Sequence, residues 1–214
     1  MNHPIRPLVW LQGGIELFLS RWYYILLFVV IQALVTALTL GILAGPVSIG
    51  LFRILDRMQD EPEYRPQIRE LFSGMDRFVD GVVYFFIWAI GVVFVIQFLI
   101  FVPVIGVLAS VAVVLLLLPL AQFGFPLIGV FGYDWKEASR TLLLGLRAQP
   151  VMLPLAGWVF ALIPIVGALF STRLPLIGFL FSLTLSGVTL SSVSYATRRL
   201  EPWLNGSYPE DEQE

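Results

Sequence analysis

Residues 81–133 read GVVYFFIWAIGVVFVIQFLIFVPVIGVLASVAVVLLLLPLAQFGFPLIGVFGY, a run of 53 residues without a single Asp, Glu, Lys or Arg. A membrane-spanning helix needs about 20 consecutive apolar residues, so this run is long enough for two spans. It must then fold back on itself once, and we expect the turn at Pro103. The stretch predicts a helical hairpin embedded in a membrane.

The composition of the whole chain agrees with a membrane protein. Hydrophobic residues make up 58% and charged residues 13% of the 214 residues, whereas globular domains average roughly 45–50% and about 25%. These values exclude a water-soluble enzyme and a disordered chain. The net charge of −2 gives no field that would attract nucleic acid. The chain has no Cys and a single His, so we expect no disulfide, no metal site and no cofactor.

Three further runs lack charged residues, at 22–52, 148–172 and 174–197. The last two are each long enough for one span. The first has 31 residues, about 46 Å as one helix, which exceeds a hydrocarbon core of about 30 Å. Gly41 and Pro46 interrupt it. We therefore expect a full span, a turn, and a shorter helix that begins at Pro46.

The sequence thus predicts an all-α, polytopic transmembrane bundle of six helices, at about 22–43, 46–59, 78–101, 103–131, 150–170 and 175–197. With both termini in the cytoplasm, only Arg173 of the 13 basic residues falls on the outer side. This is a strong positive-inside bias. The twelve cytoplasmic residues are Arg6, Arg21, Arg53, Arg57, Arg65, Arg69, Arg77, Lys136, Arg140, Arg147, Arg198 and Arg199.

Three short segments, 7–20, 67–76 and 134–147, carry apolar residues at helical spacing opposite charged ones. Asp134 and Glu137 open the third with a D-x-x-E capping pattern. Such segments are typical of helices that lie in the membrane interface. Cytoplasmic loops that pack against the bundle are the alternative.

The chain also repeats part of its sequence. Residues 101–108, FVPVIGVL, resemble residues 173–180, RLPLIGFL, 72 positions later, and Gly74 and Gly145 stand 71 positions apart. Each copy contains two spans, so both copies have the same orientation in the membrane, which is a parallel repeat. The expected organisation is an N-terminal interfacial segment (1–21), a six-helix domain (22–199) made of a first hairpin (22–59) and two repeated units (67–131 and 134–199), and an acidic disordered tail (200–214).

No charged residue stands at the middle of a predicted span, and no nucleotide-binding, hydrolase or protease motif is present. We therefore expect no catalytic residues and no enzyme. Gln32, Gln97 and Gln122 are polar residues in three different spans. They are candidates either for hydrogen bonds between helices, worth about 1 kcal/mol each, or for a polar pathway.

The strongest site candidate is Arg53, which follows Pro46 by seven residues, roughly 10 Å along a helix. A charge at that depth is costly, so we expect it to point into the bundle or a cytoplasmic pocket. Its expected partners are Asp56, Asp60, a freed carbonyl of a kinked neighbour, or a phosphate. Arg57 follows one turn later on the same face. Arg53 and Arg57 predict an anion or lipid-headgroup site, and an internal ion pair with snorkelling is the alternative.

Two segments carry a family resemblance. Residues 45–51, GPVSIGL, and 70–74, ELFSG, followed by Phe78, resemble the G-P-x-x-x-G … D/E-L-F-x-G-F pattern of a group of uncharacterised bacterial integral membrane proteins. Residues 75–77 depart from that pattern, because they separate Gly74 from the aromatic residue.

The second half, with WKEAS at 135–139 and with Tyr195 and Arg198 after the last span, is similar to the same group. The resemblance covers about residues 20–200. The group is related to the membrane domain found beside some glycerophosphodiester phosphodiesterases. It implies a six-helix inner-membrane protein without assigned catalytic residues, and we do not infer the phosphodiesterase activity.

These observations predict a multi-pass protein of the inner (plasma) membrane that takes part in transport or permeation of a small solute or lipid. The alternative is a structural or accessory protein that acts through helix packing and its cytoplasmic interfacial helices. A water-filled cavity lined by Gln32, Gln97 or Gln122 would favour transport. Membrane lipids are the expected partners, a homo-oligomer and a membrane partner protein both stay open, and nucleic acid is not expected.

Overall fold

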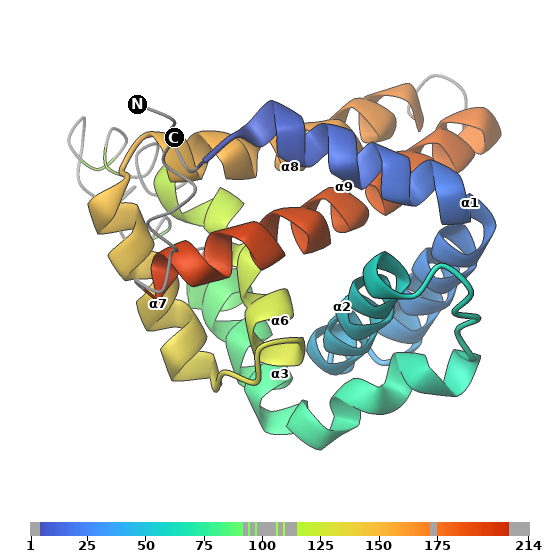
Figure 1. Cartoon of the computed structure of the whole chain (residues 1–214), viewed down its shortest axis with the longest axis horizontal. Helices are drawn as coiled ribbons and strands as arrows, with labels where there is room; N and C mark the ends of the chain where they lie inside the picture. The colour runs from blue at the N-terminus through green and yellow to red at the C-terminus, as the bar shows by residue number, and fades with distance from the viewer. Residues whose placement is uncertain are drawn as a thin grey trace.

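The computed structural model describes residues 5–91, 94, 97, 106, 109, 115–171 and 175–205. All regular structure in these residues is helical, so the predicted all-α fold class is confirmed for them. The elements in Figure 1 are α1 (Pro7–Leu38), α2 (Ala44–Asp60), the 3-10 helix η1 (Ile68–Arg77), α3 (Phe78–Phe86), the π-helical η2 (Ile87–Gly91), the 3-10 helix η3 (Leu118–Leu120), α6 (Ala121–Gly129), α7 (Trp135–Ala148), α8 (Met152–Ser171) and α9 (Pro175–Leu204).

Helix α1 joins the predicted N-terminal segment to the first predicted span. A kink divides them at Arg21, whose φ of −135° and ψ of 22° are not helical. The helix ends at Leu38, five residues before the expected boundary at 43. Leu40 and Gly41 then take positive φ angles of 50° and 86°. Glycine adopts such angles without steric cost, which explains the turn at this place.

Helix α2 lies at the centre of the bundle. Residues 44–52 are all buried, and α1, η1, α3, α6 and α9 pack around the helix. The side chains of Val47, Ile49, Leu51 and Leu55 are fully buried. The bounds of α2 agree with the short helix predicted at 46–59. Neighbouring helices of the same chain bury its first half.

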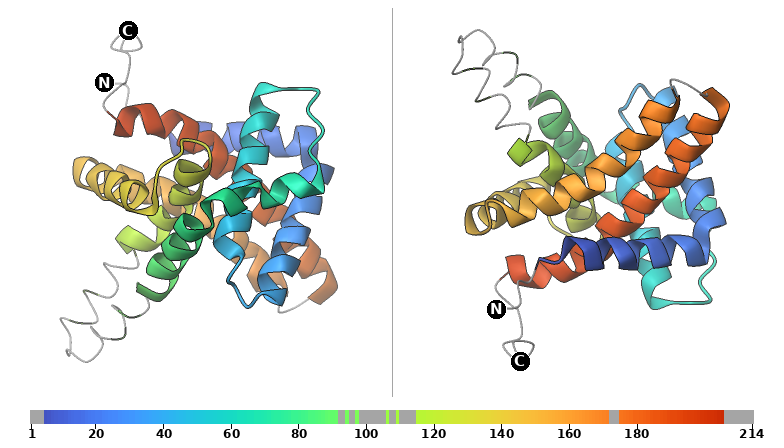
Figure 2. Two further views of the ribbon diagram at one scale, coloured as in Figure 1. Left: turned by 90° about the horizontal axis from the view of Figure 1, so that it is seen from below. Right: turned by 90° about the horizontal axis from the view of Figure 1, so that it is seen from above.

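Glycines bring the backbones of α2 and its neighbours into contact. A Cβ on Gly50 would lie 2.0 Å from the carbonyl oxygen of Leu71 in η1. A Cβ on Gly45 would lie equally close, at 2.0 Å, to the carbonyl oxygen of Gly81 in α3. The segment predicted at 67–76 is thus a 3-10 helix packed along α2, as Figure 2 shows. The interpretation of this segment as a loop element packed against the bundle fits the structure.

Helix α9 packs between α8 and α1, as the right-hand view of Figure 2 shows. Gly13 of α1 faces Tyr195, and Phe18 faces Gly187, so α1 and α9 are antiparallel. Helix α9 continues to Leu204, so residues 200–204, which we expected in a disordered tail, are helical. Residues 206–214 lie outside the described part.

Helix α7 begins as the capping pattern predicts. The Asp134 side chain accepts a hydrogen bond from the Glu137 N–H at 2.7 Å, and Glu137 accepts one from the Asp134 N–H at 3.3 Å. Both bonds satisfy N–H groups that have no partner inside the helix. Ala138, Leu142 and Gly145 are buried, so this face of α7 packs on the bundle.

Two described helical stretches are long and apolar enough to cross a membrane, Pro7–Leu38 and Ile177–Leu204. A third candidate arises if Trp135–Ala148 and Met152–Pro164, which meet at 116°, form one broken span. The structure therefore has two or three candidate membrane spans. Most of the predicted turn at 101–108, and Arg173, lie outside the described residues.

Candidate functional site

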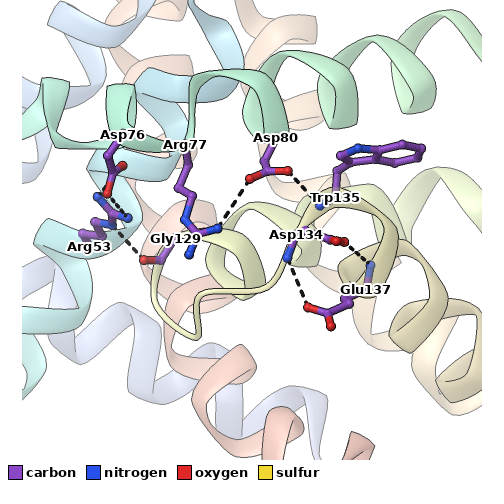
Figure 3. Close-up of polar contacts among 8 residues, drawn as sticks. All are labelled: Arg53, Asp76, Arg77, Asp80, Gly129, Asp134, Trp135 and Glu137. Carbon is purple, nitrogen blue, oxygen red and sulfur yellow. Dashed lines mark hydrogen bonds and ion pairs between the residues drawn. The ribbon is translucent and has the colours of Figure 1, made fainter.

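Arg53 leaves α2 and points across to η1 and α6 (Figure 3). Its guanidinium forms a bidentate ion pair with Asp76, with distances of 2.9 and 3.0 Å to the two carboxylate oxygens. The Nε–H donates to the Gly129 carbonyl at 2.8 Å, and Nη1 also donates to the Ser73 carbonyl at 2.8 Å. One side chain thus links three elements.

The carbonyl of Gly129 is available because α6 ends at this residue, and the last carbonyls of a helix lack partners within it. As predicted, the Arg53 side chain points into the bundle. The carbonyl at the end of α6 accepts a hydrogen bond from its guanidinium, which offsets the cost of placing the charge there. The expected carboxylate partners, Asp56 and Asp60, were wrong. The actual partner, Asp76, stands in the three residues that depart from the family pattern.

Asp56 and Asp60 both pair with Arg198 at the other end of the chain. The Arg198 Nη1 and Nη2 atoms lie 2.7 and 2.8 Å from the Asp60 carboxylate oxygens. The Nε atom forms an ion pair with Asp56 at 3.1 Å. Beside them, Gln59 donates a hydrogen bond to the Ser194 hydroxyl at 3.0 Å. The C-terminal end of α2 is therefore fastened to α9.

Figure 3 also shows a polar connection from α3 to α7. Arg77 lies 3.6 Å from the Asp80 carboxylate. The other oxygen of Asp80 accepts a hydrogen bond from the Trp135 N–H at 3.3 Å. The start of α3 is thus joined to the start of α7, beside the contacts of Arg53 with Asp76 and Gly129.

Arg57 borders a cavity of about 240 Å³ between α2, η1 and the loop that joins them. Its side chain is 62% exposed, and it contacts the Glu70 carboxylate at 3.3 Å. Its guanidinium carbon lies 6.0 Å from the centre of the Tyr64 ring. The lining residues are Arg53, Ile54, Arg57, Tyr64, Glu70 and Ser73. The two predicted site residues therefore border the same cavity.

The cavity holds a neutral hydroxyl donor beside a charged carboxylate. Burial, together with the hydrogen bond that Tyr64 donates to Glu70, raises the pKa of Tyr64 to about 12. Burial acts to raise the pKa of Glu70 as well. The hydrogen bonds from Tyr64 and from the Gln67 N–H, with the charge of Arg57, outweigh it and lower the pKa of Glu70. At neutral pH Tyr64 is protonated and Glu70 is ionised.

Sequence reasoning missed Tyr64, Glu70 and Ser73 as parts of this cavity. Glu70 and Ser73 stand in the ELFSG motif, which we used for the family resemblance, inside the segment 67–76 that we interpreted as amphipathic. The signal that could have found them is an acidic residue in a short motif ten residues after a helix that carries two arginines.

The three glutamines of the predicted spans do not line this cavity. Gln32 of α1 donates a hydrogen bond to the Ser48 hydroxyl of α2 at 2.7 Å. Gln122 of α6 donates to the Gly157 carbonyl of α8 at 2.7 Å. The side chain of Gln97 is exposed. Two of the three thus form the interhelical hydrogen bonds that were one of the two expectations.

Among the described residues, no group of three or more His, Asp or Glu side chains is placed to hold a metal ion.

Neither the protein-family models nor the curated proteins and solved structures compared with the chain give a match, so the family resemblance stays a hypothesis.

Proposed function

We propose that the chain is a multi-pass protein of the bacterial inner membrane with six spans and with both termini in the cytoplasm. The two or three candidate membrane helices support the membrane location. The twelve-to-one distribution of basic residues supports the six-span arrangement. Its proposed role is that of a non-enzymatic accessory protein, which acts through helix packing and through its cytoplasmic surface.

One observation carries the preference for this role over transport. Two of the three candidates for a polar pathway, Gln32 and Gln122, are bonded to neighbouring helices at 2.7 Å each, and the third, Gln97, is exposed. The two bonds join different pairs of helices, α1 to α2 and α6 to α8. Such bonds stabilise helix packing in membranes by about 0.6–2 kcal/mol each.

The test is the water accessibility of these two positions. The chain has no cysteine, so Gln32→Cys and Gln122→Cys each introduce the only thiol. We expect both thiols to resist a charged methanethiosulfonate reagent in inside-out vesicles, because packed helices exclude water. Arg65→Cys, at an exposed loop position, should react completely under the same conditions.

Rapid and complete reaction at both glutamine positions would indicate a water-filled path and would favour transport. A melting curve of each variant separates this outcome from simple unfolding, because an unfolded variant melts without a cooperative transition.

The proposed topology gives a second prediction. Single cysteines next to Arg173 should react with a membrane-impermeant reagent in intact cells, because this turn lies outside in the six-span arrangement. Cysteines beside Arg65 and Arg140 should react only after the cells are opened. Labelling beside Arg65 from outside would contradict the six-span arrangement.

The parallel repeat is a further part of this proposal. Gly74 and Gly145, which correspond in the two copies, are both buried where their helices pack on the bundle. Gly74 faces the backbone of α2, whereas Gly145 faces the side chains of Leu153 and Leu204, so the repeat stays a prediction.

A further inference from the structure

In the proposed topology, the cavity beside Arg57 lies at the level of the lipid headgroups. Arg21, at the kink of α1, donates a hydrogen bond to the Tyr64 carbonyl at 2.9 Å, and Tyr64 lines the cavity. The next residues of α1, Trp22 and Tyr23, are 55% and 51% exposed. Exposed Trp and Tyr residues gather at the membrane–water interface. The hydrogen bond from Arg21 therefore ties the cavity to this interfacial level.

The charges around the cavity are balanced. The positive charge of Arg53 is paired with Asp76, and that of Arg57 is paired with Glu70. A purely anionic ligand would compete with Glu70, and a purely cationic ligand would compete with Arg57. A ligand that carries both charges meets a partner at each end.

The two arginines differ in what they can offer a ligand. Arg53 already donates four hydrogen bonds within the protein. Arg57 makes one long contact at 3.3 Å, although a guanidinium has five N–H donors. An exposed ion pair of this kind contributes only about 0–1 kcal/mol, so a stronger acceptor replaces it easily.

Two hydrogen bonds hold the Glu70 carboxylate in a position where it can bind the positive charge of a ligand. The Tyr64 hydroxyl donates to one of its oxygens and the Gln67 N–H donates to the other at 3.0 Å. An ionised carboxylate has about four acceptor positions, so Glu70 can still accept a hydrogen bond from an ammonium group.

We propose that this cavity binds the phosphoethanolamine headgroup of a membrane phospholipid, with the phosphate at Arg57 and the ammonium group at Glu70. The proposal rests on the membrane location in the proposed function. A cavity of about 240 Å³ is smaller than the roughly 300–1,000 Å³ of pockets that enclose a drug-sized ligand. It therefore admits the headgroup and leaves the acyl chains in the bilayer.

The test is native mass spectrometry of the purified, delipidated full chain. The protein is titrated with phosphatidylethanolamine, phosphatidylcholine and phosphatidylglycerol that have identical acyl chains. We expect phosphatidylethanolamine to bind about tenfold more tightly than either other lipid, because one charge-assisted hydrogen bond has about that effect. The choline group cannot donate a hydrogen bond to Glu70, and the glycerol group carries no positive charge.

Two variants test which residue binds the ammonium group and which binds the phosphate. Glu70→Gln removes the negative charge and keeps one acceptor oxygen, which can hold the capping bond from the Gln67 N–H. It should abolish the preference for phosphatidylethanolamine. Arg57→Gln should weaken binding of all three lipids about tenfold. Since Arg57 is mostly exposed, its variant keeps the test decisive if Glu70→Gln folds poorly. Arg65→Gln, in the exposed loop, is the matched control and should bind as the wild type does.

Several outcomes would overturn this inference. Tighter binding of phosphatidylglycerol would indicate an anion site, and full binding by Arg57→Gln would place the lipid elsewhere. Competition by soluble O-phosphoethanolamine at the same concentration as the lipid would identify a free metabolite as the ligand. If the lipid preference fails while the thiols of the Gln32→Cys and Gln122→Cys variants stay protected, only the headgroup site is refuted and the accessory role stands.

Discussion

Gly50→Ala should lower the melting temperature of the detergent-solubilised protein by about 6–12 °C. The new Cβ would lie 2.0 Å from the carbonyl oxygen and 2.6 Å from the carbonyl carbon of Leu71. Both are backbone atoms of η1, so no side-chain rotation relieves the contact, and η1 must move away from α2. Overpacking of a tight interface costs about 1–3 kcal/mol, and we expect the upper end of this range. For a chain of this size, each kcal/mol corresponds to about 2–4 °C.

The matched control is Gly91→Ala, because nothing lies within 4 Å of a Cβ at this position. Its melting temperature should equal that of the wild type or exceed it slightly. Equal melting temperatures for the two alanine variants would show that η1 does not pack along α2 in the protein.

Arg53→Leu should lower the free energy of unfolding by about 2–3 kcal/mol. The substitution removes the donors to the Gly129 and Ser73 carbonyls and the partner of Asp76. A hydrogen bond to a charged group contributes about 1.5–3 kcal/mol. Only the bond to Gly129 is partly buried, and the bond to Ser73 is exposed to water and adds little. The pair with Asp76 adds little, because the Asp76 side chain is 57% exposed. Chemical unfolding of the purified variant, followed by tryptophan fluorescence, measures the change.

Two further variants locate the cause of this loss. Arg65→Leu changes an exposed loop residue and should shift the free energy by less than about 0.5 kcal/mol. Arg53→Lys keeps the charge but cannot reproduce the bidentate geometry, so we expect a loss between those of the two leucine variants. Equal stability of Arg53→Leu and Arg65→Leu would mean that Arg53 is solvated and links nothing.

The positions of α2, α8 and the start of α9 could be predicted from the sequence, because uncharged runs and the residues that interrupt them are local features. The helix that follows Pro46 and the turn near Gly41 were found in this way. The length of α1 could not, because the segment before Arg21 and the segment after it have different patterns, yet a kink joins them into one helix.

The burial of α2 within the bundle could not be predicted from the sequence. A helix that faces lipid and a helix that faces other helices are both apolar, so composition does not separate them. The burial of residues 44–52, with the close neighbours of Gly45 in α3 and of Gly50 in η1, reveals that α2 is a core helix.

The depth of Arg53 followed from its spacing to Pro46, but its partners did not follow from any spacing. Gly129 is 76 residues away from Arg53, and Arg198 is 138 residues away from Asp60. Asp56 and Asp60 were nearer to Arg53 along the chain and were wrongly chosen. Contacts between distant segments are set by tertiary packing, which a single sequence does not display.

The ion pair between α2 and α9 has a consequence for the order of events during synthesis. Asp60 leaves the ribosome 138 residues before Arg198, which at about 5–20 residues per second takes roughly 7–28 seconds. During that time α2 carries two carboxylates whose cationic partner does not yet exist. Helix α2 therefore completes its contacts only when the last helix has been made, and a ribosome that stalls before Arg198 leaves a chain in which the C-terminal end of α2 has no partner in α9.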